Sequence, residues 1–214
     1  MADTGYRNPT VGQSIVISGG DKHWSNPTRI YTSNNSYASA NLYADEKSHW
    51  LRAKTFGFSI PGDATINGIT VQIERRGSRT DVRDNSVKIV KAGSASGTEK
   101  KVYTSWPGSD AYQTYGGSTD KWGLTWTPAQ INATNFGVGI SAKYIGIYIS
   151  ANAYVDHIRI KVYYTPYVPP LPDMKVNISD TFRQVSEIKL NVGDVWRTVT
   201  EVWINIGDVW RQVF

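Results

Sequence analysis

The sequence predicts an all-β protein, a jelly-roll-like β-sandwich followed by a small repeat domain of three β-hairpins. Short runs that alternate apolar and polar residues recur up to residue 164, as strands with one buried face require. The chain has 13 Tyr and 8 Trp against 5 Phe, with 19 Gly, a mixture typical of strands and tight turns. A 14-residue repeat at the C-terminal end predicts the hairpins.

About eight strands, the number in a jelly roll, are expected in the first domain after an arm without periodicity at residues 1–13. The segment at 29–32 lies within an expected loop at 21–36. The alternating segments are 14–17, 29–32, 37–44, 49–60, 65–75, 87–91, 100–104, 136–143, 147–150 and 154–164. Residues 105–123 are expected to form a long loop rich in Trp, Tyr and Gly. Thr127 before Pro128 predicts an N-cap with proline at the first helical position, and hence one helical turn.

A proline-rich segment at residues 166–173 holds four of the nine prolines. Proline lacks the N–H that a central strand needs and favours stiff, extended chain. The sequence therefore predicts a β-sandwich domain at 1–165, a linker at 166–173 and three hairpin repeats at 174–214.

The repeat reads MKVNISDTFRQVSEI, then KLNVGDVWRTVTEV, then WINIGDVWRQVF, and an aspartate recurs every 14 residues at 180, 194 and 208. In the middle copy, two alternating runs flank a Gly-Asp pair, which is a hairpin signal. The expected register places Val192 opposite Val195 and Leu190 opposite Arg197. In the first copy Ser179 replaces the turn glycine, so a different turn is expected there.

Such hairpins have an aliphatic face that includes the arginine of each copy and an opposite face that carries the aromatic residues. Both faces need cover, and a unit of about 40 residues without disulfides or metal usually gains stability by association. The expected assembly interface consists of Phe182, Trp196, Trp203, Trp210, Arg183, Arg197 and Arg211. The alternative is that the hairpins pack on the chain's own first domain.

Several function classes lose support from the sequence. The absence of cysteine excludes disulfides and cysteine zinc sites. No apolar run approaches the roughly 20 residues of a membrane span, and the N-terminus has no signal-peptide pattern, so synthesis in a cytoplasm is expected. No catalytic motif is present, and His23, His49 and His157 lack metal-binding spacing. No enzyme activity, cofactor or metal is therefore expected. A carboxylate pair for glycoside hydrolysis (Asp45 with Glu46, or Asp81 with Asp84) and a calcium loop at 81–85 stay as alternatives.

Two clusters are candidate contact sites. Four arginines around an expected turn form a candidate contact for an acidic partner or a phosphate, or a solvated loop tip: Arg75, Arg76, Arg79 and Arg83. The aromatic residues of the long loop are candidates for stacking on a glycan or a partner, or for packing: Trp106, Tyr112, Tyr115 and Trp122.

The first domain resembles a β-sandwich module of tailed-bacteriophage virion proteins. The segments that carry this resemblance are 56–61 (FGFSIP), 64–71 (ATINGITV), 115–117 (YGG), 122–127 (WGLTWT) and 136–138 (FGV). The Gly-Asp-x-Trp-Arg-x-Val phrase of the repeats is similar to Gly-Gly-x-Trp-Lys-x-Val repeats of phage structural and tail-fibre-like proteins. Aspartate in place of the second glycine, and Ser179, depart from that pattern.

The resemblance implies a non-enzymatic component of the virion, such as a head decoration protein or a tail-fibre accessory. The expected partners are further copies of the chain, with a trimer as the expected form, and virion proteins such as the major capsid protein. No membrane or nucleic-acid partner is expected. The aromatic loop supports an alternative of another class, a carbohydrate-binding or receptor-binding module of a phage fibre. A glycan-degrading enzyme is a third hypothesis.

Overall fold

The computed structural model describes residues 1–147 and 150–168 continuously. In the C-terminal part it describes residues 175–178, 181–184, 189–192, 195–199, 203–206 and 209–212. Contacts divide the chain into two compact units, Met1–Tyr167 and Val168–Phe214. The boundary between the units lies in the proline-rich segment, and each unit is described separately below.

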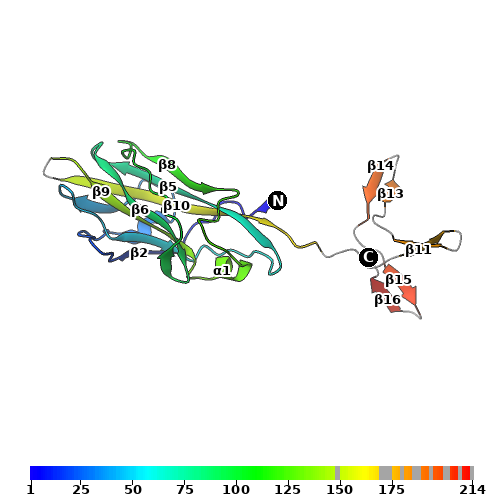
Figure 1. The fold of residues 1–214 in the computed structure, drawn as a ribbon. Coiled ribbons are helices and arrows are strands. Elements are labelled where there is room, and N and C mark those ends of the chain that lie inside the picture. The colour runs from blue at the N-terminus through cyan, green and yellow to red at the C-terminus, as the bar shows by residue number, and fades with distance from the viewer. Residues whose placement is uncertain are drawn as a thin grey trace. The chain divides into compact units, whose positions relative to one another are not determined.

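The first unit is a sandwich of two antiparallel five-stranded sheets (Figure 1), which confirms the predicted all-β fold class. Sheet A has the order β1-β10-β5-β8, and β3 also pairs with β10. Its strands are β1 (Ala2–Asp3), β3 (Ala38–Leu42), β5 (Thr65–Gly77), β8 (Ala111–Gly117) and β10 (Ala151–Thr165).

Sheet B has the order β2-β4-β9-β6-β7. Its strands are β2 (Val11–Ile15), β4 (Trp50–Lys54), β6 (Val82–Lys91), β7 (Ser94–Ser96) and β9 (Gly137–Tyr144). From β2 to β6 and from β7 to β10 the chain changes sheet at every connection, which is the connectivity of a jelly-roll-like sandwich.

The core lies between the two sheets and is built by the inward side of each alternating strand. In β5, Ile69, Val71 and Ile73 are fully buried, and in β10 so are Ile158 and Ile160. These residues come from the runs with the clearest period-two pattern in the sequence. The outward side of each sheet carries polar and aromatic residues.

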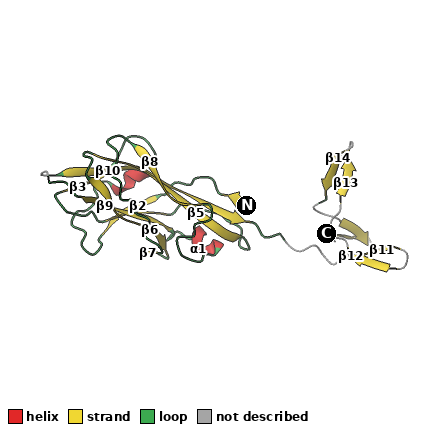
Figure 2. Cartoon of the chain, turned by 45° about the horizontal axis from the view of Figure 1, so that its top comes forward, coloured by secondary structure: helices red, strands yellow, loops and turns green. Residues whose placement is uncertain are grey.

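The described residues include two helical turns, which Figure 2 draws in red. The predicted turn after Thr127 is α1 (Pro128–Asn132), and its N-cap is a complete capping box in which Thr127 and Gln130 bond each other's backbone N–H. The strand expected at 29–32 is absent, because Pro27–Ile30 form a 3-10 helix after left-handed Asn26. Proline at the first helical position favours this turn over an extended strand.

Three other expectations about strands were wrong. The strand expected at 49–60 ends at Lys54, because Thr55 and Gly57 have φ angles of 59° and 64°, outside the extended region. No strand forms at 100–104, where side-chain carboxylates instead of a neighbouring strand accept the amide N–H groups of Lys101 and Val102. The long loop expected at 105–123 contains β8.

The remaining differences concern the ends of segments. The predicted arm contains β1 and the start of β2, and the predicted strand at 87–91 begins earlier, at Val82. The strand expected at 147–150 includes residues 148 and 149, which lie outside the described residues.

In the second unit the described residues form three antiparallel strand pairs. The pairs are β11 (Lys175–Ile178) with β12 (Thr181–Gln184), β13 (Lys189–Val192) with β14 (Val195–Thr198), and β15 (Trp203–Ile206) with β16 (Val209–Gln212). In the middle pair Leu190 lies opposite Arg197 and Val192 opposite Val195, which is the predicted register. The other two pairs have the same register.

The side chains of the predicted assembly residues lie outside the described part of the structure. These residues occupy equivalent positions, since Phe182, Trp196 and Trp210 each pair with an asparagine on the preceding strand. Among the described residues, no helix is long and apolar enough to span a membrane.

Candidate functional site

The aromatic residues predicted to contact a glycan belong mostly to the core. Trp106, Tyr115 and Trp122 are 1%, 3% and 0% exposed. The indole Nε1 of Trp106 donates to Asp84 at 2.8 Å, and that of Trp122 donates to a backbone carbonyl of β5 at 3.0 Å. Because the rings are enclosed and their donors satisfied, the prediction that these three residues contact a ligand is wrong. Tyr112, the fourth member, stays partly exposed.

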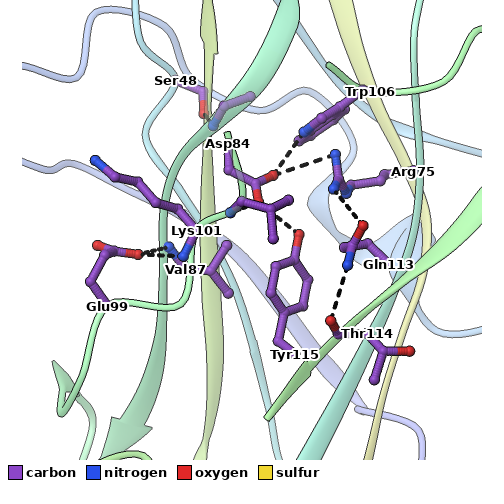
Figure 3. A network of polar contacts seen from close by, with 12 residues as sticks. Ser48, Arg75, Asp84, Val87, Glu99, Lys101, Trp106, Gln113, Thr114 and Tyr115 are labelled. Carbon is purple, nitrogen blue, oxygen red and sulfur yellow. Dashed lines mark hydrogen bonds and ion pairs between the residues drawn. The ribbon is translucent and has the colours of Figure 1, made fainter. Parts of the chain in front are cut away.

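A buried carboxylate explains why this loop turns inward (Figure 3). Asp84 of β6 accepts hydrogen bonds from Trp106 Nε1 at 2.8 Å and from the Tyr115 hydroxyl at 2.9 Å. Its Oδ1 lies 3.4 Å from Nη1 of Arg75, which belongs to the opposite sheet. Burial, and next the charge of Asp84, raise the pKa of Tyr115 well above its usual value, so this phenol keeps its proton and donates.

The four arginines predicted to form one contact patch are separated by the fold. Arg75 is 1% exposed and lies inside the sandwich, whereas Arg76 is the outward neighbour at the end of β5. Arg79 lies in the connection, where its Nε donates to the carbonyl of Ser150 at 3.2 Å. Arg83 lies on β6, in the other sheet. A single contact surface for an acidic partner is therefore wrong, because successive strands here belong to different sheets.

The outer face of sheet A carries tyrosines, and its cations lie between them. The guanidinium carbon of Arg76 lies 4.6 Å from the ring centroid of Tyr37 and 4.4 Å from that of Tyr154. Arg76 also pairs with Asp110 at 3.4 Å. A hydrogen bond to Asp110, followed by burial, raises the pKa of Tyr37. At this end of the face, Arg76 and its aromatic and acidic neighbours therefore contact one another.

The same arrangement recurs further along sheet A. The guanidinium carbon of Arg159 lies 4.4 Å from the ring of Tyr6 and 4.3 Å from that of Tyr112, and its Nε donates to Gln72 at 2.9 Å. Lys161 lies over the ring of Tyr6 at 4.7 Å. Arg159 therefore has aromatic and polar partners within the protein, and Lys161 has aromatic ones, so these cations cover ring faces on which a ligand would stack.

The outer face of sheet B carries a groove of about 210 Å³ that reaches from β2 to the β6–β7 turn. Its walls include the apolar side chains of Ile15, Val90 and Ala95. The indole of Trp50 lies over the central strand, since a Cβ at Gly139 would come within 2.7 Å of its Cε3. Glycine at this position lets the ring lie against the sheet, and the ring stays partly exposed.

Arg52 extends the same groove and is held from two sides. Its Nη1 donates to the carbonyl of Gly93 and its Nη2 to Oε1 of Gln13, each at 2.8 Å. Gly93 follows Ala92 in the β6–β7 turn, and both have positive φ, 51° and 83°. That combination is the type I′ hairpin turn, whose twist matches the flanking strands. The turn therefore holds a carbonyl where it fixes the guanidinium beside the indole.

The candidate catalytic carboxylates have structural partners. Asp45 pairs with Lys143 at 2.9 Å, and Glu46 pairs with Lys22 at 3.2 Å. A hydrogen bond from Lys143, and next the charge of Lys143, lower the pKa of Asp45. Asp84 is enclosed, and in the described part of the chain no three residues of the metal-binding types gather in one place. Nothing in this set has the arrangement of an acid and a base facing a substrate.

Sequence reasoning missed the groove, although one signal was readable. In Trp50-Leu51-Arg52-Ala53-Lys54 the apolar residues alternate with an aromatic and two cations, which assigns the latter to one outward face. Gly137 and Gly139 alternate in the same way on β9. The pairing of β4 with β9, which brings these two patterns together, is a long-range contact that neither segment specifies alone.

Comparison of the sequence with protein-family models and with curated proteins gives no match. Several solved structures are distantly similar, including the following two. One, described as "CBM4 structure and function", is 10% identical with a TM-score of 0.38, and the match covers 74% of this chain and 94% of that chain. The other is the N-terminal cellulose-binding domain of β-1,4-glucanase C from Cellulomonas fimi, 13% identical with a TM-score of 0.27, covering 77% of this chain and 90% of that chain. These likenesses are too distant to carry an argument about the ligand.

Proposed function

We propose that the sandwich is a non-enzymatic carbohydrate-binding module that holds a sugar ring in the groove of sheet B. The observation that carries this proposal is the partly exposed indole of Trp50, which lies along the sheet beside Arg52. A flat aromatic ring packs against the C–H face of a pyranose, while a fixed guanidinium donates to ring hydroxyls.

The size of the groove indicates how much of a glycan it contacts. Pockets that enclose drug-sized ligands have volumes of roughly 300–1,000 Å³, and this groove is smaller, at about 210 Å³. The groove lies on the outer face of sheet B, because residues of several strands of that sheet line it. We therefore expect one sugar unit of a longer chain to sit at Trp50, with neighbouring units lying over the sheet.

A simpler interpretation is that Trp50 only covers a glycine, which is a known way of filling a gap in a sheet. That role would be served by a fully buried ring. Here the ring stays partly exposed and borders a groove that is also lined by Arg52, which two hydrogen bonds hold in place. Pre-organisation of this kind lowers the entropy that binding must offset.

Affinity measurements with soluble polysaccharides test the proposal. Trp50→Ala should lower the affinity for the bound glycan by about tenfold or more, the effect of truncating a central aromatic contact. The matched control is Tyr154→Ala on the outer face of sheet A, which should leave the affinity unchanged. Retention of binding by Trp50→Ala, with a wild-type unfolding midpoint, would exclude this groove as the site.

A second proposal concerns the C-terminal part and is favoured by the identical register of its three strand pairs. We propose that the hairpins attach the chain to other subunits, as the resemblance to phage structural proteins implies, with further copies of the chain or a capsid protein as partners. Light scattering on the full chain and on residues 1–167 tests it. Oligomers are expected only for the full chain, and monomers in both samples would contradict self-association.

A further inference from the structure

The outward positions of sheet B have an unusual charge composition. The residues of β4, β6 and β9 whose side chains alternate with the buried positions include cations and no carboxylate. These cations are Arg52, Lys54, Arg83, Lys88 and Lys143.

The strand register places these charges around the groove. Arg52 and Lys88 lie on either side of Gly139, as its partners on β4 and β6. Their backbones are separated by two strand spacings, about 10 Å. Lys54 lies beside Gly137 in the next outward row. An extended ligand over the two glycines would therefore pass between cations on both sides.

These charges are not neutralised within the described residues. Of the five, only Lys143 forms an ion pair, and its partner Asp45 has a side chain that is 85% exposed. Arg83 lies directly opposite Lys143, a like-charge pairing that destabilises a sheet. The field of this face extends over about 8 Å at physiological salt, so neighbouring cations reinforce each other.

We infer that the groove of sheet B binds an anionic polysaccharide, a glycan whose units carry carboxylate or sulfate groups. This inference rests on the proposed carbohydrate-binding function and names the class of ligand. Trp50 provides the stacking surface for a sugar ring, while Arg52, Lys54 and Lys88 pair with acidic groups of that unit and its neighbours. Electrostatic complementarity of this kind fixes register and accelerates association.

The aromatic content of the face favours a glycan over single-stranded nucleic acid. Proteins that bind single strands provide a series of aromatic rings on which successive bases stack. Among the outward positions of the described strands β2, β4, β6 and β9, Trp50 is the single aromatic residue. One ring surrounded by cations suits a ligand that stacks once and carries repeated negative charge.

Calorimetric titration of the full-length protein with four probes tests this inference. The probes are a neutral soluble glucan, polygalacturonate, dextran sulfate and a single-stranded oligo(dT). We expect one or both anionic glycans to bind at least tenfold more tightly than the neutral glucan at low salt, with an affinity that falls as salt rises. A preference between polygalacturonate and dextran sulfate identifies the acidic group.

Variants locate the site. The double variant Lys54→Ala/Lys88→Ala should lower the affinity for the anionic glycan at least tenfold and flatten its salt dependence, and Lys54→Arg/Lys88→Arg should restore both. Lys161→Ala on sheet A is the matched control, expected to bind as wild type. Unchanged affinity in the double Ala variant overturns the inference.

The two proposals fail in different ways. If the neutral glucan binds as tightly as the anionic glycans, with no salt dependence and with loss in Trp50→Ala, the carbohydrate-binding function stands and the anionic ligand is wrong. If no glycan binds, both are wrong. Tighter binding of oligo(dT) than of any glycan would replace both with nucleic-acid binding.

Discussion

The outer faces of the two sheets both carry cations and aromatic residues, but the contacts of the cations differ between them. On sheet A, Arg76 lies between the rings of Tyr37 and Tyr154 and pairs with Asp110. On sheet B, Lys88 has no ion-pair partner among the described residues. A cation satisfied by its own protein contributes to stability, whereas one left open near a groove is available to a ligand. A binding face is therefore identified by the contacts that each residue makes within the protein, and not by residue type alone.

This contrast also decides between two interpretations of the aromatic loop. From the sequence, Trp106, Tyr112, Tyr115 and Trp122 were candidates either for stacking on a glycan or a partner, or for packing. Trp106 and Trp122 are core residues, and the rings of Tyr6 and Tyr112 on sheet A are covered by arginine and lysine. On sheet B, Trp50 and Arg52 border the groove, where Arg52 is held by Gly93 and Gln13. Lys88, on the other side of Gly139, has no ion-pair partner among the described residues.

The largest expected effect concerns the interior link between the two sheets. Asp84→Asn removes the charge that pairs with Arg75, which is buried in the opposite sheet. Breaking a buried pair leaves an uncompensated charge and costs about 3–5 kcal/mol in the free energy of unfolding. Urea denaturation measures this change. Asp45→Asn is the control, since its exposed pair with Lys143 on sheet B should leave the unfolding midpoint unchanged; equal effects would mean that the inner and outer pairs are equivalent.

A smaller effect compares the two outer faces directly. Arg159→Ala removes contacts with the rings of Tyr6 and Tyr112 and a hydrogen bond to Gln72, so we expect a loss of about 1–2 kcal/mol in stability. Lys88→Ala on sheet B breaks no ion pair among the described residues and should stay within about 0.5 kcal/mol of wild type. Thermal unfolding of both variants provides the measurement. A Lys88→Ala variant as unstable as Arg159→Ala would show that the cations of sheet B are structural.

The sequence predicted those elements whose pattern is local. The run at 65–75 became β5 because its Ile and Val alternate, and α1 formed where Thr127 and Gln130 specify a capping box. The prediction failed where distant groups decide the structure. Residues 100–104 are not a strand because Asp84 and Glu99 take their amide N–H groups. A pattern of five residues contains no information about such partners.

The candidate site was harder to predict than the fold, for the same reason. The outward positions of Trp50, Arg52 and Lys54 follow from alternation in one segment. Their position beside Gly139 and Lys88 depends on the pairing of β4 with β9 and of β9 with β6. These strands are about 90 and 50 residues apart in sequence, and long-range pairing of this kind is set by the whole sandwich.

The last contrast between the faces depends on pH. On sheet A, Nε2 of His157 lies 3.0 Å from Oδ1 of Asn8, and its Nδ1 lies 2.8 Å from the hydroxyl of Tyr112. These contacts tie the N-terminal segment to β8, and the neutral imidazole makes both of them when its Nε2 carries the proton. The neighbouring titratable groups are Glu74 on β5, directly opposite, and Asp156 and Arg159 on β10.

Burial, and next the charge of Arg159, lower the pKa of His157, against a smaller opposing effect of Asp156. The unfolded chain therefore binds this proton more readily than the folded one, and stability is lost as pH falls below about 6.5. Urea denaturation between pH 7 and 5, above the range in which most carboxylates titrate, should show this loss. His157→Gln should flatten it, and His23→Gln should not. No histidine lines the groove of sheet B, so its affinity for a neutral glycan should be constant over the same range. An equal pH dependence of stability in wild type and His157→Gln would contradict the assignment.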